Sequence, residues 1–152
     1  MADKFPVEAW FAAVSSHDVE RLRAFLLPET RYEDVPSGTV NQGVEAVLNF
    51  FQMTWSAIPD FKLEPRHAFQ SGDDVAVEWL ATGTHLGDFP GLPATGNAFH
   101  ARGVSLMQVA GDKLRRVSDF SDLATSGLLP APAAEREVAG VDGSTQAIDT
   151  AA

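Results

Sequence analysis

A chain of 152 residues with 45% hydrophobic residues, a formal net charge of −10 and no cysteine suits one domain with its own hydrophobic core. The acidic charge argues against nucleic acid and anionic membranes as partners, because both are bound through clustered Lys and Arg. Without cysteine, disulfides, thiol nucleophiles and Cys-ligated zinc are excluded. The first residues lack a signal-peptide pattern, and no apolar run approaches the roughly 20 residues of a membrane-spanning helix, so we expect a cytoplasmic protein.

The first sixty residues show mainly helical periodicity. Apolar residues recur at helical spacing over residues 5–14 and predict a first helix. A second helix is predicted to begin after an Asp cap at residue 18 and to be stopped by Pro28. A strand follows at residues 30–35, and after a Pro-Ser-Gly turn the apolar spacing of residues 43–55 predicts a third helix.

The next sixty residues change to the period of two that is typical of strands. Four segments are predicted to be long strands: residues 61–70, 73–84, 98–110 and 113–121. They are separated by SGDD, by a Gly/Pro-rich segment and by a tight Gly-Asp turn. The order predicts an α+β fold in which three N-terminal helices cover one concave face of a curved, mostly antiparallel sheet. We expect a blind pocket between that face and the helices.

The end of the sequence has a different composition. After Leu129, Ala, Pro, Gly and small polar residues show neither the helical nor the strand period over more than a few positions. We therefore expect one domain over residues 1–129 and a disordered C-terminal tail over residues 130–152.

Asp119, in the last predicted strand, is the strongest candidate for chemistry. Alternation places Val117, Asp119 and Ser121 on one face of that strand. Asp122 stands directly before LATSGLL, where it can cap a short helix, so it has a structural explanation that Asp119 lacks. A carboxylate that faces an apolar cavity has a raised pKa and can both take and give a proton. The alternative for Asp119 is a solvated acid on an exposed face.

Five motifs carry a family resemblance. They are AWFAAVSSHDVERLRAFL, RYEDVPSG followed by QGVEAVLNFF, IPDF, GTHLGDFPGLPATG and GDKLRRVSDFSDLAT. Their order and spacing over about residues 7–129 resemble the SnoaL-like polyketide cyclases of the nuclear transport factor 2-like superfamily. The resemblance implies a cystatin-like cone without a cofactor, and a homodimer formed through sheet faces.

The resemblance also implies which residues line the pocket. Asp119 matches an acid of the cyclases and of limonene-epoxide hydrolases, and Tyr32 matches a water-holding tyrosine of those hydrolases. Asp34 matches the general base of ketosteroid isomerases, and Trp10 falls near their oxyanion-binding tyrosine.

Other positions depart from these patterns. Trp79 and Ala81 stand where the epoxide hydrolases need Arg and Asp. Gly103 and Ser105 stand where the isomerases need a protonated acid and where the cyclases often have His or Gln. Neither of the two better-known constellations is therefore complete.

We interpret the protein as a cyclase or isomerase of a hydrophobic, carbonyl-bearing small molecule, acting by an aldol-type ring closure. Asp119 would be the acid/base, and Asp34 and Tyr32 would orient or share its proton. The apolar, substrate-binding wall is predicted to include Trp10, Phe51, Trp55, Trp79 and Met107. At helical spacing, several of these are also ordinary core residues.

Two alternatives stay open. One is a noncatalytic small-molecule-binding or dimeric scaffold protein, because fold does not dictate function. It gains if Asp34 or Asp119 is exposed, or is neutralised by Arg31 or Arg102. The other, a minor alternative, is an epoxide hydrolase-like ring opening.

The histidines are too scattered to suggest a metal site, so we expect none. His85 lies in the Gly/Pro-rich segment, and His100 and Arg102 alternate away from the predicted pocket face. We interpret these three residues as surface or subunit-contact residues.

Overall fold

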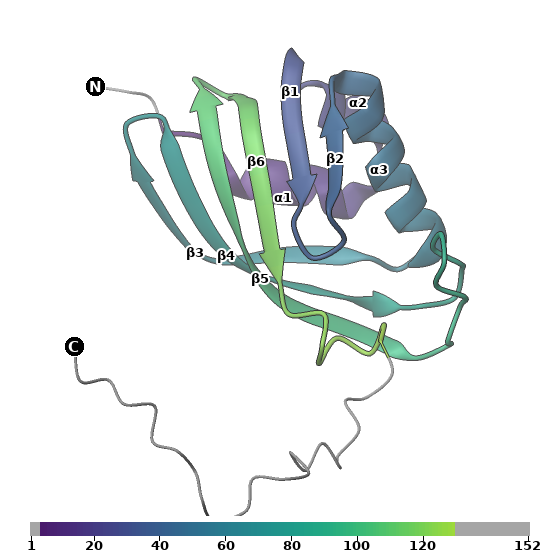
Figure 1. Cartoon of the computed structure of the whole chain (residues 1–152). Helices are drawn as coiled ribbons and strands as arrows, with labels where there is room; N and C mark the ends of the chain where they lie inside the picture. Colours follow the sequence, from purple (N-terminus) through teal and green to yellow (C-terminus); the bar gives the residue numbers. More distant parts are fainter. Residues whose placement is uncertain (1–3, 130–152) are drawn as a thin grey trace, which may run out of the picture.

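The computed structural model describes residues 4–129 (Figure 1). Its elements are α1 (Val7–Ser16), α2 (Val19–Arg23), β1 (Leu26–Asp34), β2 (Thr39–Gln42), α3 (Val44–Ala57), β3 (Lys62–Ser71), β4 (Asp74–Thr84), β5 (Ala98–Ala110) and β6 (Lys113–Ser121). The strands form one curved sheet in the order β2-β1-β6-β5-β4-β3. Neighbours are antiparallel except β1 and β6, which run parallel.

The helices cover the inner face of this sheet. Helix α1 packs against β3, and α3 packs against β1 and β2. Their apolar stripes supply Trp10, Val14, Val47 and Phe51 to one core that also takes the inward side chains of the strands. The predicted α+β fold, three helices on a curved and mostly antiparallel sheet, is confirmed. None of the helices within residues 4–129 is long and apolar enough to cross a membrane.

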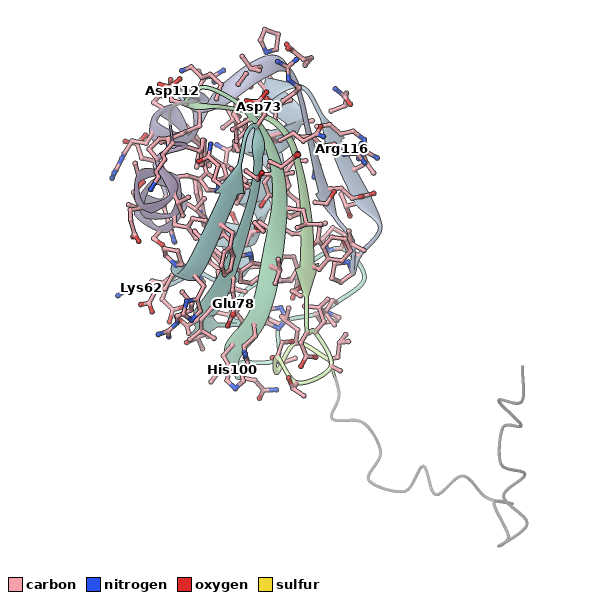
Figure 2. The ribbon with its side chains drawn as sticks, turned by 90° about the vertical axis from the view of Figure 1, so that its left-hand side faces the viewer. Lys62, Asp73, Glu78, His100, Asp112 and Arg116 are labelled. Atoms are coloured by element: carbon pink, nitrogen blue, oxygen red, sulfur yellow. The ribbon has the colours of Figure 1, made fainter. Side chains whose placement is uncertain are left out.

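The alternation of burial in the long strands separates an inner from an outer face. In β5, every second residue from Phe99 to Val109 is buried. The residues between them face outward on the side of the sheet that the helices leave uncovered. Figure 2 looks onto this side, with the turns at Asp73 and Asp112 at one end of the sheet and His100 at the other.

The second helix and the following strand differ from prediction. Helix α2 ends at Arg23, and Pro28 does not stop a helix but lies inside β1. Proline cannot donate to a strand ladder, and the pairing of β1 with β6 shifts its register between Leu26 and Arg31. Thr30 bridges this irregularity, because its Oγ1 accepts from Leu27 N at 2.7 Å and donates to Leu114 O at 2.5 Å. The short strand β2 was also missed.

The helix predicted after Asp122 is wrong. The Asp122 carboxylate caps a turn instead, accepting hydrogen bonds from the backbone N and the Oγ1 of Thr125. The segment that follows is tied to the start of β5 by a hydrogen bond from His100 N to Ser126 O. Gly127 has a left-handed φ of +87° and leaves no room for a side chain, because a Cβ there would lie 2.3 Å from Ala98 O. The tail predicted over residues 130–152 lies outside the described residues.

We predict that Gly127→Ala destabilises the fold by more than Gly91→Ala. Both glycines have a positive φ, which costs an alanine about 1–2 kcal/mol, but a Cβ at Gly91 has nothing within 4 Å. Urea unfolding of the two variants compares them. Equal losses of unfolding free energy would show that the packing of residues 123–129 on β5 adds no stability.

Candidate functional site

Asp119 lies on the inner face of β6, between β1 and β5. Asp119 is 9% exposed, whereas the next residue, Phe120, which points to the other face of the sheet, is 45% exposed. The predicted inward face of β6, with Val117 and Asp119, is therefore correct. A buried carboxylate loses the solvation that stabilises its charge, so its hydrogen-bond partners decide its chemistry.

Two hydroxyl groups hold the Asp119 carboxylate. Tyr32 Oη donates to Oδ2, and Ser105 Oγ donates to Oδ1 at 2.5 Å. Ser105 lies directly opposite Asp119 in the β5–β6 pairing, and Tyr32 reaches it from β1. The Ser105 oxygen accepts a further hydrogen bond, at 2.8 Å, from Trp79 Nε1 on β4. Side chains from β1 and β5, and through Ser105 one from β4, thus converge on one carboxyl group of β6.

Burial raises the pKa of Asp119 from its ordinary value near 3.8 to about 6. The hydrogen bonds from Ser105 and Tyr32 oppose this rise, and the negative charge of Asp34 adds to it. Burial also raises the pKa of the Tyr32 phenol well above its usual value, with a further contribution from the charge of Asp119. Tyr32 therefore stays protonated, whereas Asp119 can change its protonation state near neutral pH.

Asp34 is the neighbour of Asp119 in the parallel pairing of β1 with β6. It is half-buried at the end of β1, and its carboxylate accepts a hydrogen bond from Ser37 in the following turn. Asp34 thus acts on Asp119 through its charge.

Within residues 4–129, no arginine neutralises Asp119. Arg31 pairs with Glu33 at 3.6 Å, and Arg102 pairs with Glu78 at 3.5 Å. Among the ion pairs within residues 4–129, none includes Asp119. The condition that would favour a noncatalytic protein is therefore not met at this residue.

The five residues predicted as the apolar wall all lie in the core. Trp10, Phe51, Trp55, Trp79 and Met107 are at most 8% exposed. The Phe51 ring lies 5.2 Å from the Tyr32 ring and 5.9 Å from that of Trp10, both edge to face. Trp55 is fixed by a hydrogen bond from its Nε1 to Val14 O. The Tyr32 ring is thus packed against the aromatic part of this core.

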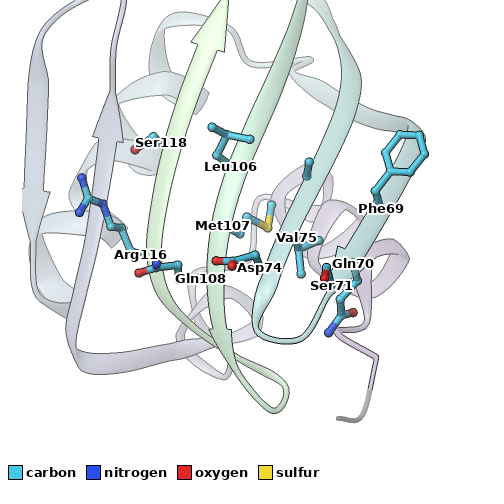
Figure 3. Close-up of a pocket in the computed structure, with 11 residues that line it drawn as sticks. Phe69, Gln70, Ser71, Asp74, Val75, Leu106, Met107, Gln108, Arg116 and Ser118 are labelled. Atoms are coloured by element: carbon cyan, nitrogen blue, oxygen red, sulfur yellow. The ribbon is translucent and has the colours of Figure 1, made fainter. Parts of the chain in front are cut away.

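A hollow of about 570 Å³ lies on the outer face of the sheet (Figure 3), on the side opposite to the predicted blind pocket. It is lined by Phe69, Leu106 and other residues of β3 to β6, including Asp74 and Arg116, and its lining does not include Asp119.

The interpretation of His85 as a surface or subunit-contact residue is wrong, because its side chain is fully buried. Its Nδ1 is 3.1 Å from Thr95 Oγ1, and its ring lies 5.5 Å from the Phe89 ring. The histidine thus forms the centre of the folded Gly/Pro-rich segment. His100 and Arg102 are exposed, as expected.

Ser105 belongs to the site although it was not among the predicted site residues. Its position was interpreted only as a departure from the pattern of related enzymes. The available signal was the alternation of Gly103, Ser105 and Met107, which places all three on one face of β5. What the sequence does not reveal is the register that sets Ser105 opposite Asp119.

The sequence profile of the SnoaL-like polyketide cyclase family matches residues 4–127, so the chain belongs to this family. IdmH from Streptomyces antibioticus, a candidate polyketide cyclase, is 27% identical over 76% of this chain and 88% of its own, with a TM-score of 0.65. A protein of ketosteroid isomerase-like fold from Catenulispora acidiphila, solved with trimethylamine, is 22% identical over 84% and 97% of the two chains, with a TM-score of 0.73.

A candidate SnoaL-like cyclase from a Jannaschia species is 21% identical over 86% of this chain and 99% of its own, with a TM-score of 0.71. At these lower identities the likeness establishes the fold, which is the cone of ketosteroid isomerase-like and nuclear transport factor 2-like proteins. No curated protein matches the sequence.

We predict that the stability of the wild type falls between pH 4 and pH 6 relative to Asp119→Asn. The raised pKa means that the folded protein holds the Asp119 proton more tightly than the unfolded chain does. The contribution of this proton to the free energy of unfolding is therefore lost as the pH rises through 6. A rise of roughly two units corresponds to about 3 kcal/mol. Urea unfolding of both proteins from pH 4 to 7 measures this difference. A difference that does not change with pH would contradict the burial of an unpaired carboxyl group.

Proposed function

We propose that this protein is a cofactor-independent cyclase or isomerase of a hydrophobic, carbonyl-bearing small molecule, with Asp119 as its acid/base. The observation that supports this most is a buried carboxyl group with a pKa of about 6, which two hydroxyls hold and with which no cation of residues 4–129 pairs. Such a group costs free energy to bury and is suited to moving a proton at neutral pH. The family supports a polyketide-like substrate.

The proposed reaction is an intramolecular aldol closure. The Asp119 carboxylate removes a proton from a carbon that lies between two carbonyl groups, which leaves an enolate. The enolate carbon bonds to a second carbonyl carbon of the same molecule, and the π electrons of that carbonyl move to its oxygen. The protonated Asp119 then returns its proton to this alkoxide. The carboxylate is regenerated, and no other reactant is required.

The other site residues would support this cycle. Tyr32 touches the reacting carboxylate and would orient it, while the charge of Asp34 raises the pKa of Asp119 and so makes it a stronger base. The wall that would fold the flexible substrate into its reactive shape is Trp10, Phe51, Trp55, Trp79 and Met107. Because these side chains are at most 8% exposed, a substrate could reach them only if neighbouring side chains moved.

That close packing is also the observation that favours the alternative, a noncatalytic small-molecule-binding or dimeric scaffold protein. An interior filled by its own side chains is what a stable scaffold needs. Epoxide opening is the weaker alternative, because Trp79 and Ala81 replace the required Arg and Asp, and the Trp79 N–H is directed at Ser105.

We predict that Asp119→Asn abolishes turnover while the fold stays intact, because the amide cannot take up a proton. Asp122→Asn is the matched control, since its carboxylate is exposed and caps a turn. Pools of polyketide, steroid and terpenoid compounds are tested for binding by ligand-observed NMR and for conversion by mass spectrometry.

Conversion by the wild type and by Asp122→Asn, together with binding but no conversion by Asp119→Asn, would support the enzyme. A fully active Asp119→Asn variant would refute the role of Asp119. Binding that is equal in all three proteins and never followed by conversion would support the noncatalytic alternative.

We further propose that the outer face of the sheet pairs with a second copy of the chain. Apolar side chains gather on this face, where Phe69 is 73%, Leu106 51% and Phe120 45% exposed. Arg116 and Asp74 stand on opposite sides of Gln108 in the β6-β5-β4 part of the sheet, so one half of the hollow is basic and the other acidic (Figure 3). A face with this charge pattern is complementary to a copy of itself.

We predict that Leu106→Asp converts a dimer into a monomer. The substitution places a charge in the middle of the apolar face, where its desolvation would oppose pairing. Leu86→Asp is the matched control, because Leu86 is 60% exposed but belongs to the segment between β4 and β5. Sedimentation equilibrium gives the mass of each variant. A monomeric wild type, or a Leu106→Asp variant that remains dimeric, would contradict this interface.

A further inference from the structure

Trp79 and Ser105 form the buried start of a hydrogen-bond chain that ends on Asp119. The indole Nε1 donates to Ser105 Oγ at 2.8 Å, and Ser105 Oγ donates to Asp119 Oδ1 at 2.5 Å. Trp79 is 6% and Ser105 2% exposed, so water does not compete for these groups. Both residues stand at positions where the sequence departs from the patterns of related enzymes.

We propose that Trp79 and Ser105 are positioning residues that direct the mobile proton of Asp119 to Oδ2, the carboxylate oxygen beside Tyr32. This inference rests on the proposed function for its catalytic meaning, because the proton in question is the one that Asp119 would move. The arrangement itself is a property of the folded protein, with or without turnover.

The direction of the chain follows from the inventory of donors and acceptors. An indole N–H can only donate, so the Ser105 oxygen must accept from Trp79. The single hydrogen of the Ser105 hydroxyl then goes to Asp119 Oδ1. A proton on Oδ1 would force this hydrogen away from its acceptor, and a buried hydroxyl hydrogen without a partner is costly. Oδ1 therefore remains an acceptor throughout.

The Tyr32 side of the carboxylate is different. A phenol hydroxyl can donate and accept, so Tyr32 Oη donates to the ionised Oδ2 and can accept from the protonated one. When it accepts, its own hydrogen is released for a substrate oxygen. The hydrogen bond between Tyr32 Oη and Asp119 Oδ2 can thus reverse its direction, and the proposed proton transfers would take place at this end of the hydrogen-bond chain.

Gly103 leaves the space that the Trp79 indole occupies. It is the cross-strand neighbour of Trp79, and a Cβ at residue 103 would lie 2.4 Å from the indole Cη2 and Cζ2 atoms and 2.7 Å from Phe120 O. Only the absence of a side chain lets the Trp79 ring lie across β5 and reach Ser105. Gly103 leaves space for the Trp79 ring, and the ring donates to Ser105, so the three residues depend on one another. This is a physical reason for finding them together in this sequence.

The test is a double-variant cycle read by the titration of Asp119. Trp79→Phe keeps an aromatic ring but removes the N–H, and Ser105→Ala removes the hydroxyl. The ¹³C resonance of the Asp119 carboxyl, assigned by its loss in Asp119→Asn, gives the pKa of this group in each protein. The titratable residues that act on Asp119 are Tyr32 and Asp34, and both are left unchanged.

We expect each single variant to raise the pKa of Asp119, Ser105→Ala by about one unit. The double variant should match Ser105→Ala alone, because Trp79 acts only through the serine hydroxyl. Ser105→Thr retains a hydroxyl and should restore the wild-type value. Trp55→Phe, which removes an indole N–H bonded to Val14 O elsewhere in the core, should leave the pKa unchanged.

A Trp79→Phe variant with the wild-type pKa would overturn the proposal, since a merely structural tryptophan would change stability alone. Additive shifts in the double variant would also overturn it. Because the titration needs no substrate, it tests the positioning role of Trp79 and Ser105 even if the protein converts no compound. If the protein does turn over a substrate, the acidic limb of the kcat/KM profile should move with the titrated pKa.

Discussion

The desolvation of one carboxyl group is the constraint on which the site depends. An ionised Asp119 in the core is costly, and no cationic side chain in the described part of the chain pairs with it. The compensation comes from two hydroxyl donors, which lower the cost without removing it. A salt bridge would have left an inert carboxylate, and an apolar surrounding without donors would have left an inert acid. The intermediate case, with two donors and no cation, is the one that can change protonation state near neutral pH.

A single irregularity in β6 makes this arrangement possible. The pairing of β5 with β6 shifts between Gln108 and Val109, so that Arg115 and Arg116 both face outward between the buried Leu114 and Val117. Without this bulge, strict alternation from Leu114 would turn Asp119 to the outer face. The bulge therefore determines both that the carboxylate is buried and that Ser105 is its partner.

Most of the architecture could be predicted because it follows from local patterns. The four long strands and the third helix have periods that burial enforces. Alternation grouped Asp119 with Val117, and the family resemblance correctly indicated that their face points inward. Contacts that depend on register or on the filling of space could not be predicted. Because of the bulge next to Arg115, the pairing of Ser105 with Asp119 cannot be deduced from the sequence. His85 was interpreted as exposed because its Gly/Pro-rich segment has no period that indicates burial. The short helix α2 ends early because tertiary pairing draws Leu26 into β1.

The same alternation connects the two faces of the sheet. On β5, Ser105 points to Asp119 while its neighbour Leu106 points into the outer hollow, and on β6 Asp119 alternates with the exposed Phe120. The carboxylate and its Ser105 donor are thus held by two strands, β5 and β6, that also carry exposed apolar side chains on the outer face. A partner bound to the outer face would restrain β5 and β6 without touching the site. Since the hydrogen bonds of Asp119 join β6 to β1 and β5, the proposed pairing would act on their geometry through the sheet itself.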